Sequence, residues 1–250
     1  AGRALPGEIR VGGENILAAP VELTGRTARG SLAFAPGKLV PEETKADRAR
    51  FAVSQESAEV ALSAQVTTEF DGMVRVDLAL TPKGAGPVVV RELDLVIPLT
   101  EKYATLYYLI KDGGDFYDPN RQGRTPDDWK GPFTPCLWLG NEELGLTWFT
   151  ESSRRWLPAR SKDAVEISRR DGRTELRLKL IRGEFALTEP LIYTFGLQAT
   201  PVKPMPANWQ DIRVSCWTED EPNIFIEWAH PWNMKWFAFP EPAEGAQAKY

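Results

Sequence analysis

The chain has 250 residues, and 42% of them are hydrophobic, which is enough for a substantial core. This length fits one large all-β domain, or one domain together with part of another. The formal net charge of −5 argues against a nucleic-acid partner, because such a partner requires a basic face that neutralises phosphates. No apolar stretch approaches the roughly 20 residues of a membrane-spanning helix, so we expect no membrane span.

Cysteine and histidine are too few for most metal chemistry. Cys136 and Cys216 are the only two cysteines, and both lie in apolar runs. We expect buried free thiols, with a disulfide between them as the alternative. His230 is the only histidine, which argues against a zinc site. A serine-hydrolase elbow, a P-loop and a dinucleotide-binding glycine pattern are missing from the sequence, so we expect no metal and no cofactor.

The first 60 residues give weak structural signals. Residues 9–11 and 16–23 are short extended candidates, interrupted by glycine and proline. Residues 42–50 have the only helical composition in the chain, but they lack a continuous apolar stripe. We expect a short exposed helix or a loop there.

Two alternating segments follow, and they predict a β-hairpin. Apolar residues occupy every second position through residues 58–66 and again through residues 74–80. A period of two with one apolar side predicts half-buried antiparallel strands. Asp71 and Gly72 lie between them and suit a type I′ turn, whose two central residues need positive φ.

Two further strands are predicted before a long loop. Residues 88–97 form the first, bounded by Pro87 and Pro98, and residues 103–110 form the second. Residues 111–132 are rich in Gly, Pro and Asp, which predicts an irregular loop. A loop of that length in a compact domain is usually functional or mobile.

Residues 133–156 are the most distinctive stretch. Two short apolar runs, which contain Trp138 and Trp148, flank a polar turn between Gly140 and Gly145. This pattern predicts a β-hairpin with a loop longer than two residues. Because tryptophan is costly to leave in water, we expect both rings to pack in the core or between domains.

Three more strands complete the predicted domain. Residues 164–168 and 174–181 flank an Asp-Gly turn, and residues 191–199 follow. Strand therefore succeeds strand with turn signals between them from residue 9 to residue 199. This order predicts an all-β fold, a two-sheet antiparallel β-sandwich over residues 1–200.

The character of the sequence changes after residue 200. Three prolines within residues 201–206, PVKPMP, predict a stiff extended connector. Residues 207–250 contain strand-like segments and many aromatic residues, but about 45 residues are too few for a core of their own. We expect a second, incomplete domain there.

Four segments in this order carry a resemblance: FDGMVRVDLALTP, VVVRELDLVIPLTEKYATLYY, PCLWLGNEELGLTWFTESSRRW and LIYTFGLQATPVKPMP. From about residue 17 to residue 206, the chain resembles the N-terminal β-sandwich region of large bacterial glycoside hydrolases related to family 123, the β-N-acetylgalactosaminidases. The resemblance implies that a (β/α)8 barrel follows the sandwich and carries an adjacent Asp-Glu pair for substrate-assisted retention. Residues 207–250 would then be the start of this catalytic barrel, truncated here.

The resemblance also implies that this chain alone lacks the catalytic residues, because a barrel needs about 200 residues or more. Glu219, Asp220 and Glu221 contain an adjacent acidic pair near the barrel's start, whereas the family's pair belongs further along. We therefore expect a solvated loop there. The parent would be a secreted or periplasmic glycosidase with a glycan substrate, and the missing barrel would be this chain's partner.

Four residues near the C-terminus are the candidate substrate-binding residues: Trp228, His230, Trp232 and Trp236. Aromatic rings suit the C–H faces of sugars, and nearby polar groups bond to the hydroxyls. At the C-terminal end of a first barrel strand, these residues would face the mouth of the active site. Packing of the sandwich against the barrel is the alternative.

Two other polar clusters carry weaker predictions. The long loop contains four oxygen-bearing side chains that match no defined calcium motif, Asp112, Asp115, Asp118 and Asn120. A solvated acidic loop is the expectation for them. Glu151, Arg154 and Arg155 follow the distinctive hairpin, and we expect surface ion pairs, with a sugar-binding role as the alternative.

Three functions stay open from the sequence. The first is an accessory sandwich of a glycoside hydrolase, which braces the catalytic barrel and helps to shape the glycan cleft. The second is a free-standing carbohydrate-binding module. The third is a structural or interaction sandwich without a sugar function.

Overall fold

The computed structural model describes residues 2–110, 121–158 and 160–202, together with the backbone of residues 214–215 and 224–225. The chain divides into two compact units, residues 1–204 and 205–250. Most of the predicted proline-rich connector and of the predicted barrel start lies outside the described residues, so these domain assignments stay predictions.

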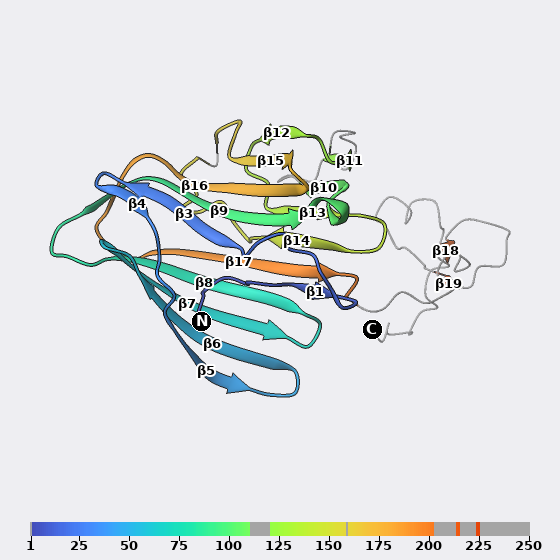
Figure 1. Cartoon of the computed structure of the whole chain (residues 1–250), viewed down its shortest axis with the longest axis horizontal. Coiled ribbons are helices and arrows are strands. Elements are labelled where there is room, and N and C mark those ends of the chain that lie inside the picture. The colour runs from blue at the N-terminus through green and yellow to red at the C-terminus, as the bar shows by residue number, and fades with distance from the viewer. Residues whose placement is uncertain (1, 111–120, 159, 203–213, 216–223, 226–250) are drawn as a thin grey trace, which may run out of the picture. The chain divides into compact units, whose positions relative to one another are not determined.

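The first unit is a sandwich of two antiparallel sheets, as the alternating pattern predicts (Figure 1). The larger sheet has nine strands in the spatial order β11 (Gln122–Arg124), β10 (Leu106–Ile110), β13 (Cys136–Gly140), β14 (Gly145–Phe149), β17 (Leu191–Thr200), β8 (Met73–Pro82), β7 (Val60–Glu69), β6 (Arg48–Glu56) and β5 (Lys38–Thr44). The smaller sheet has six, in the order β12 (Asp128–Gly131), β15 (Val165–Arg170), β16 (Arg173–Leu187), β9 (Val88–Thr100), β3 (Glu22–Thr27) and β4 (Gly30–Leu32).

Short elements complete the description. β1 (Arg10–Val11) pairs with β2 (Glu14–Asn15), and a 3-10 turn, η1 (Glu101–Tyr103), lies between β9 and β10. In the second unit, β18 (Val214–Ser215) pairs with β19 (Ile224–Phe225) in parallel.

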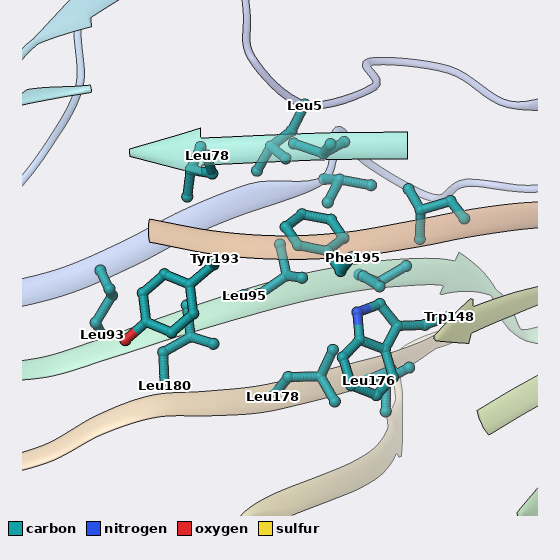
Figure 2. Close-up of a cluster of buried hydrophobic side chains, with 14 of the residues drawn as sticks. Leu5, Leu78, Leu93, Leu95, Trp148, Leu176, Leu178, Leu180, Tyr193 and Phe195 are labelled. Atoms are coloured by element: carbon teal, nitrogen blue, oxygen red, sulfur yellow. The ribbon is translucent and has the colours of Figure 1, made fainter. Parts of the chain in front are cut away.

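The core lies between the two sheets (Figure 2). Leu93 and Leu95 of β9 and Leu178 of β16 point from the smaller sheet towards Trp148 and Tyr193 of the larger one. None of these five side chains is more than 2% exposed. Burial of each such side chain contributes about 1.5–3 kcal/mol to stability, which explains why the core-facing positions of these strands are apolar.

The hairpin predicted around Asp71 and Gly72 is confirmed, but the prediction of a type I′ turn is wrong. Gly72 has a φ of 82°, whereas the φ of Asp71 is not positive, so only one of the two central residues adopts the left-handed conformation that this turn type requires. The Asp71 carboxylate also accepts a hydrogen bond from the Met73 N–H at 3.0 Å. This turn joins β7 to β8 in the larger sheet. At the second predicted Asp-Gly turn, Asp171 and Gly172 both have positive φ, 53° and 74°.

The prediction of a helix or loop at residues 42–50 is wrong. These residues form the end of β5, a three-residue connection at 45–47 and the start of β6, at the edge of the larger sheet. Their charges belong to an exposed edge strand, where Glu43 lies 3.2 Å from the Arg48 guanidinium. Charged side chains discourage pairing with another chain at such an edge, so helical composition was a poor guide here.

Two other boundaries also differ from the prediction. Pro98 does not end its strand, because β9 continues to Thr100. The Pro98 carbonyl accepts a hydrogen bond from the Ala18 N–H, so the proline nitrogen points away from β16 and the missing N–H costs no bond to that strand. The expected loop at residues 111–132 contains β11 and β12 in its described part.

Candidate functional site

The outer face of the larger sheet carries aromatic side chains. In β13 and β14, Leu137, Leu139, Leu146 and Trp148 face the core and are at most 3% exposed. Trp138 and Phe149 alternate with them and lie half-buried on the opposite face. Core packing is therefore confirmed for Trp148 and wrong for Trp138, while inter-domain packing of Trp138 stays a prediction.

Glycines let these rings lie against the sheet. A Cβ at Gly145 would come within 2.4 Å of Trp138 Nε1, and a Cβ at Gly196 would come within 2.2 Å of the Phe149 ring. The Trp138 indole donates a hydrogen bond to Thr200 Oγ1 at 3.0 Å. The rings therefore lie directly against the backbone of these glycines.

Polar groups continue the same face on β17 and β8. Thr194 Oγ1 donates to Asp77 Oδ1 at 2.7 Å, and Arg75 Nε donates to Asp77 Oδ2 at 2.9 Å. Burial acts to raise the pKa of the Asp77 carboxyl, but the hydrogen bonds from Arg75 and Thr194 and the Arg75 charge outweigh it. The pKa of Asp77 therefore lies below its ordinary value, and this carboxylate is an acceptor rather than an acid.

A cavity of about 310 Å³ lies where β14 ends and β17 continues. β14 stops at Phe149, so residues 191–195 of β17 lack a partner strand on that side. The segment 150–158, which we call the arginine loop, lies along this edge. Thr150 Oγ1 donates to the Thr194 carbonyl at 2.8 Å, and Tyr193 Oη donates to the Arg155 carbonyl at 3.2 Å. These bonds fix both ends of the cavity wall.

The cavity brings together the three charged residues of the arginine loop. Glu151, Arg154 and Arg155 all line it, and the two arginines are exposed. The expectation of surface ion pairs is wrong, because no ion pair within 4.0 Å in the described part of the chain involves any of the three. Glu151 interacts with Arg75 by charge alone. The sugar-binding alternative for these residues stays open.

Another cavity, of about 320 Å³, lies beside the N-terminal segment but has fewer available polar groups. The Gln55 side chain accepts from the Ala4 N–H and donates to the Ala35 carbonyl. Arg3 lies 3.9 Å from Glu22. Because these groups already have partners, the cavity of the arginine loop is the stronger candidate for a polar ligand.

Most of the site residues predicted from sequence lie outside the described residues. These are Trp228, His230, Trp232 and Trp236, the acidic residues 219–221, and the oxygen-bearing residues of 111–120. Cys136 has a free thiol, half-buried rather than buried, and its burial raises the pKa of that thiol. Cys216 lies outside the described residues.

Sequence reasoning missed three residues of this region, Phe149, Tyr193 and Thr194. The alternation in GLTWF and LIYTFG contains the missing signal, because it places Phe149 and Thr194 on one face and Tyr193 on the other. Among the described residues, no cluster of three or more His, Cys, Asp or Glu side chains could hold a metal ion. No helix in the described ranges has the length and apolarity to cross a membrane.

The fold and the site together define a two-layer β-sandwich domain whose outer face combines aromatic rings with a polar cavity. Residues 6–201 match the family model described as glycoside hydrolase 123, third domain. The chain belongs to this family, which confirms the relationship to family 123 that the sequence segments indicate. No curated protein matches the chain significantly.

One solved structure supports the sandwich fold. The Slr1438 protein from Synechocystis sp. PCC 6803 is similar with a TM-score of 0.51 and 13% identity, over 79% of this chain and 89% of that one. A galactose mutarotase related enzyme from Lactobacillus acidophilus gives a TM-score of 0.43 and 9% identity, over 76% and 89%. A galactose 1-epimerase from the same species is similar with a TM-score of 0.43 and 10% identity, over 80% of this chain and 77% of that one. At 13% identity, the similarity to the Slr1438 protein shows the fold alone.

Proposed function

We propose that this chain is a non-catalytic accessory domain of a glycoside hydrolase, and that it contacts the glycan through the outer face of its larger sheet. The observation that carries this proposal is membership of the glycoside hydrolase 123 domain family over residues 6–201. A bacterial parent, secreted or periplasmic, with a catalytic barrel as this domain's partner belongs to the same proposal.

The chemistry of the outer face supports glycan contact. The C–H faces of sugars pack on aromatic rings, and their hydroxyls need hydrogen-bonding groups close by. Phe149 offers a half-buried ring on this face, and it directly precedes Thr150, which lines the cavity of the arginine loop. Glu151 and the two arginines of that loop supply an acceptor and donors, and no ion pair within 4.0 Å among the described residues would have to break.

The carboxyl groups support a non-catalytic role. Glycoside cleavage commonly uses an acid whose pKa is raised and a second carboxylate roughly 5–10 Å away. Within the described ranges, every carboxyl with a displaced pKa is displaced downward, namely Glu43, Asp77, Asp163 and Glu166. Basic neighbours or hydroxyl donors hold each of these groups in its ionised form.

The sequence-predicted contacts of Trp228, His230, Trp232 and Trp236 with substrate extend this proposal to the parent enzyme. There they would stand at the mouth of the barrel. Alanine substitution of these four residues in the parent should raise KM more than it lowers kcat, if they hold the substrate without taking part in the chemistry.

A glycan array with the purified chain, run beside a hydrolysis assay on an aryl N-acetylgalactosaminide, tests the function proposed for this chain. We expect selective glycan binding and no hydrolysis. Hydrolysis would show that the chain is an enzyme by itself. Silence on the array would favour a structural sandwich without sugar contact.

A further inference from the structure

We propose that the cavity of the arginine loop recognises an acidic sugar, one that carries a carboxylate or a sulfate. This inference rests on the proposed function and specifies the class of glycan. Arg154 and Arg155 provide its central observation, since both line the cavity and neither has a carboxylate within 4.0 Å among the described residues.

Like a few other arginines of the described sandwich, these two have no carboxylate partner within 4.0 Å. Most arginines there are held by carboxylates, such as Arg26 by Glu92 at 2.8 Å and Arg177 by Asp94 at 2.8 Å. A guanidinium presents paired N–H groups whose geometry matches the two oxygens of a carboxylate or sulfate. The two side chains of the arginine loop are therefore available for an anionic group.

Glu151 gives the cavity its preference for a sugar over a simple anion. Its carboxylate lines the same cavity, and the field of Arg75 offsets part of its charge. A carboxylate accepts hydrogen bonds from hydroxyl groups, which a sugar carries and an inorganic anion lacks. The volume of about 310 Å³ lies at the small end of ligand cavities, roughly 300–1,000 Å³, and fits a single sugar unit.

The arginine loop is held in shape before any ligand binds. Arg155 has a φ of 70°, in the left-handed region that a non-glycine residue rarely adopts. The hydroxyl of the buried Tyr193 donates to the Arg155 carbonyl and supports this conformation. A backbone fixed in this way reduces the ordering cost of binding.

Two matched pairs of sugars test the proposal by calorimetry with the whole chain. The first pair is methyl β-glucuronide and methyl β-glucoside, and the second is N-acetylgalactosamine 6-sulfate and N-acetylgalactosamine. We expect at least one acidic sugar to bind about tenfold more tightly than its neutral counterpart. Raising the salt concentration should weaken the binding of the acidic sugar only, because salt screens its charge interaction with the arginines.

Arginine variants locate the effect. Arg154→Gln and Arg155→Gln should each lower the affinity for the acidic sugar by about tenfold, towards that of the neutral one. Arg160→Gln removes the same charge from an exposed residue of the following turn that does not line the cavity, so its affinity should stay within about twofold. Both cavity positions are exposed, so folding should survive.

Three results would overturn the inference. Equal affinities for the acidic and neutral sugars, unchanged in the variants, would reject it and leave the proposed glycan contact standing. If inorganic sulfate binds as tightly as the sulfated sugar, the cavity is an anion site that does not recognise the sugar ring. Absence of binding for all four sugars would reject the inference, and a silent glycan array would then reject the proposed function separately.

Discussion

Tyr193 joins the core of the sandwich to its candidate site, since its hydroxyl donates to the Arg155 carbonyl at 3.2 Å. The ring of Tyr193 is 2% exposed and packs against Trp156, at 5.8 Å between centroids. The shape of the arginine loop therefore depends on a buried side chain of β17.

Tyr193→Phe should lower the free energy of unfolding by about 0.5–1.5 kcal/mol, because it removes one hydrogen bond and keeps the ring. Burial raises the pKa of Tyr193 above its ordinary value of 10.0. The unfolded state therefore ionises first, and the stability that the neutral hydroxyl provides is present below pH 10 and lost as the pH rises further.

Urea unfolding of the wild type and of Tyr193→Phe at pH 8 and at pH 11 checks this prediction. The difference between the two proteins should be smaller at pH 11. A difference that grows above pH 10 would show that the hydroxyl is not held in its neutral form.

Leu178→Ala should cost about 2–5 kcal/mol of unfolding free energy, because Leu178 is 0% exposed between the two sheets. Ile192→Ala offers a matched control on β17, where the side chain is 47% exposed and a change within about 0.5 kcal/mol is expected. Chemical denaturation measures both. Equal losses would contradict the placement of the core.

Gly145→Ala should destabilise the β13–β14 hairpin by about 1–3 kcal/mol, because the new Cβ would fall 2.4 Å from Trp138 Nε1. The indole must then move away from Thr200 and lose its hydrogen bond. Gly84→Ala is the control, since nothing lies within 4 Å of a Cβ there. Identical unfolding midpoints for the two variants would mean that the indole moves without cost.

Lys179 holds the turn that follows the arginine loop. Its ammonium group lies 3.0 Å from Asp163 and 2.5 Å from Glu166, and its side chain is only 7% exposed. Lys179→Met should lower the free energy of unfolding by about 1–3 kcal/mol at pH 7, because it leaves two carboxylates without this partner.

Lys179→Met should also change how the stability of the protein depends on pH in acid. Hydrogen bonds from Ser161 and Lys179 lower the pKa of Asp163 from 3.8 to about 2. The stability that ionised Asp163 contributes is present above pH 3.8 and lost as the pH falls towards 2. The difference in melting temperature between wild type and Lys179→Met should therefore narrow over that range. Thermal unfolding at pH 7, 4 and 2.5 measures it, and a constant gap would assign the effect to packing.

Alternation and turn chemistry predicted most of the fold. The burial of Leu93 and Leu178 followed from period-two patterns, and that of Trp148 followed from the cost of exposing an indole to water. The Asp-Gly pair at residues 71–72 predicted the hairpin, although only its glycine has positive φ. The edge strand β5 and its neighbour β6 were missed because the edge carries charges, which remove the apolar signal. The cavity of the arginine loop could not be foreseen, because it depends on where β14 stops relative to β17.

The central claim is that this domain holds a glycan without cleaving it. Native mass spectrometry of the purified chain, incubated with an oligosaccharide that contains N-acetylgalactosamine and an acidic sugar, tests this directly. We predict a one-to-one complex with the oligosaccharide intact after prolonged incubation. Shortened oligosaccharide, or no complex at concentrations where a glycan-binding control protein is saturated, would contradict the account.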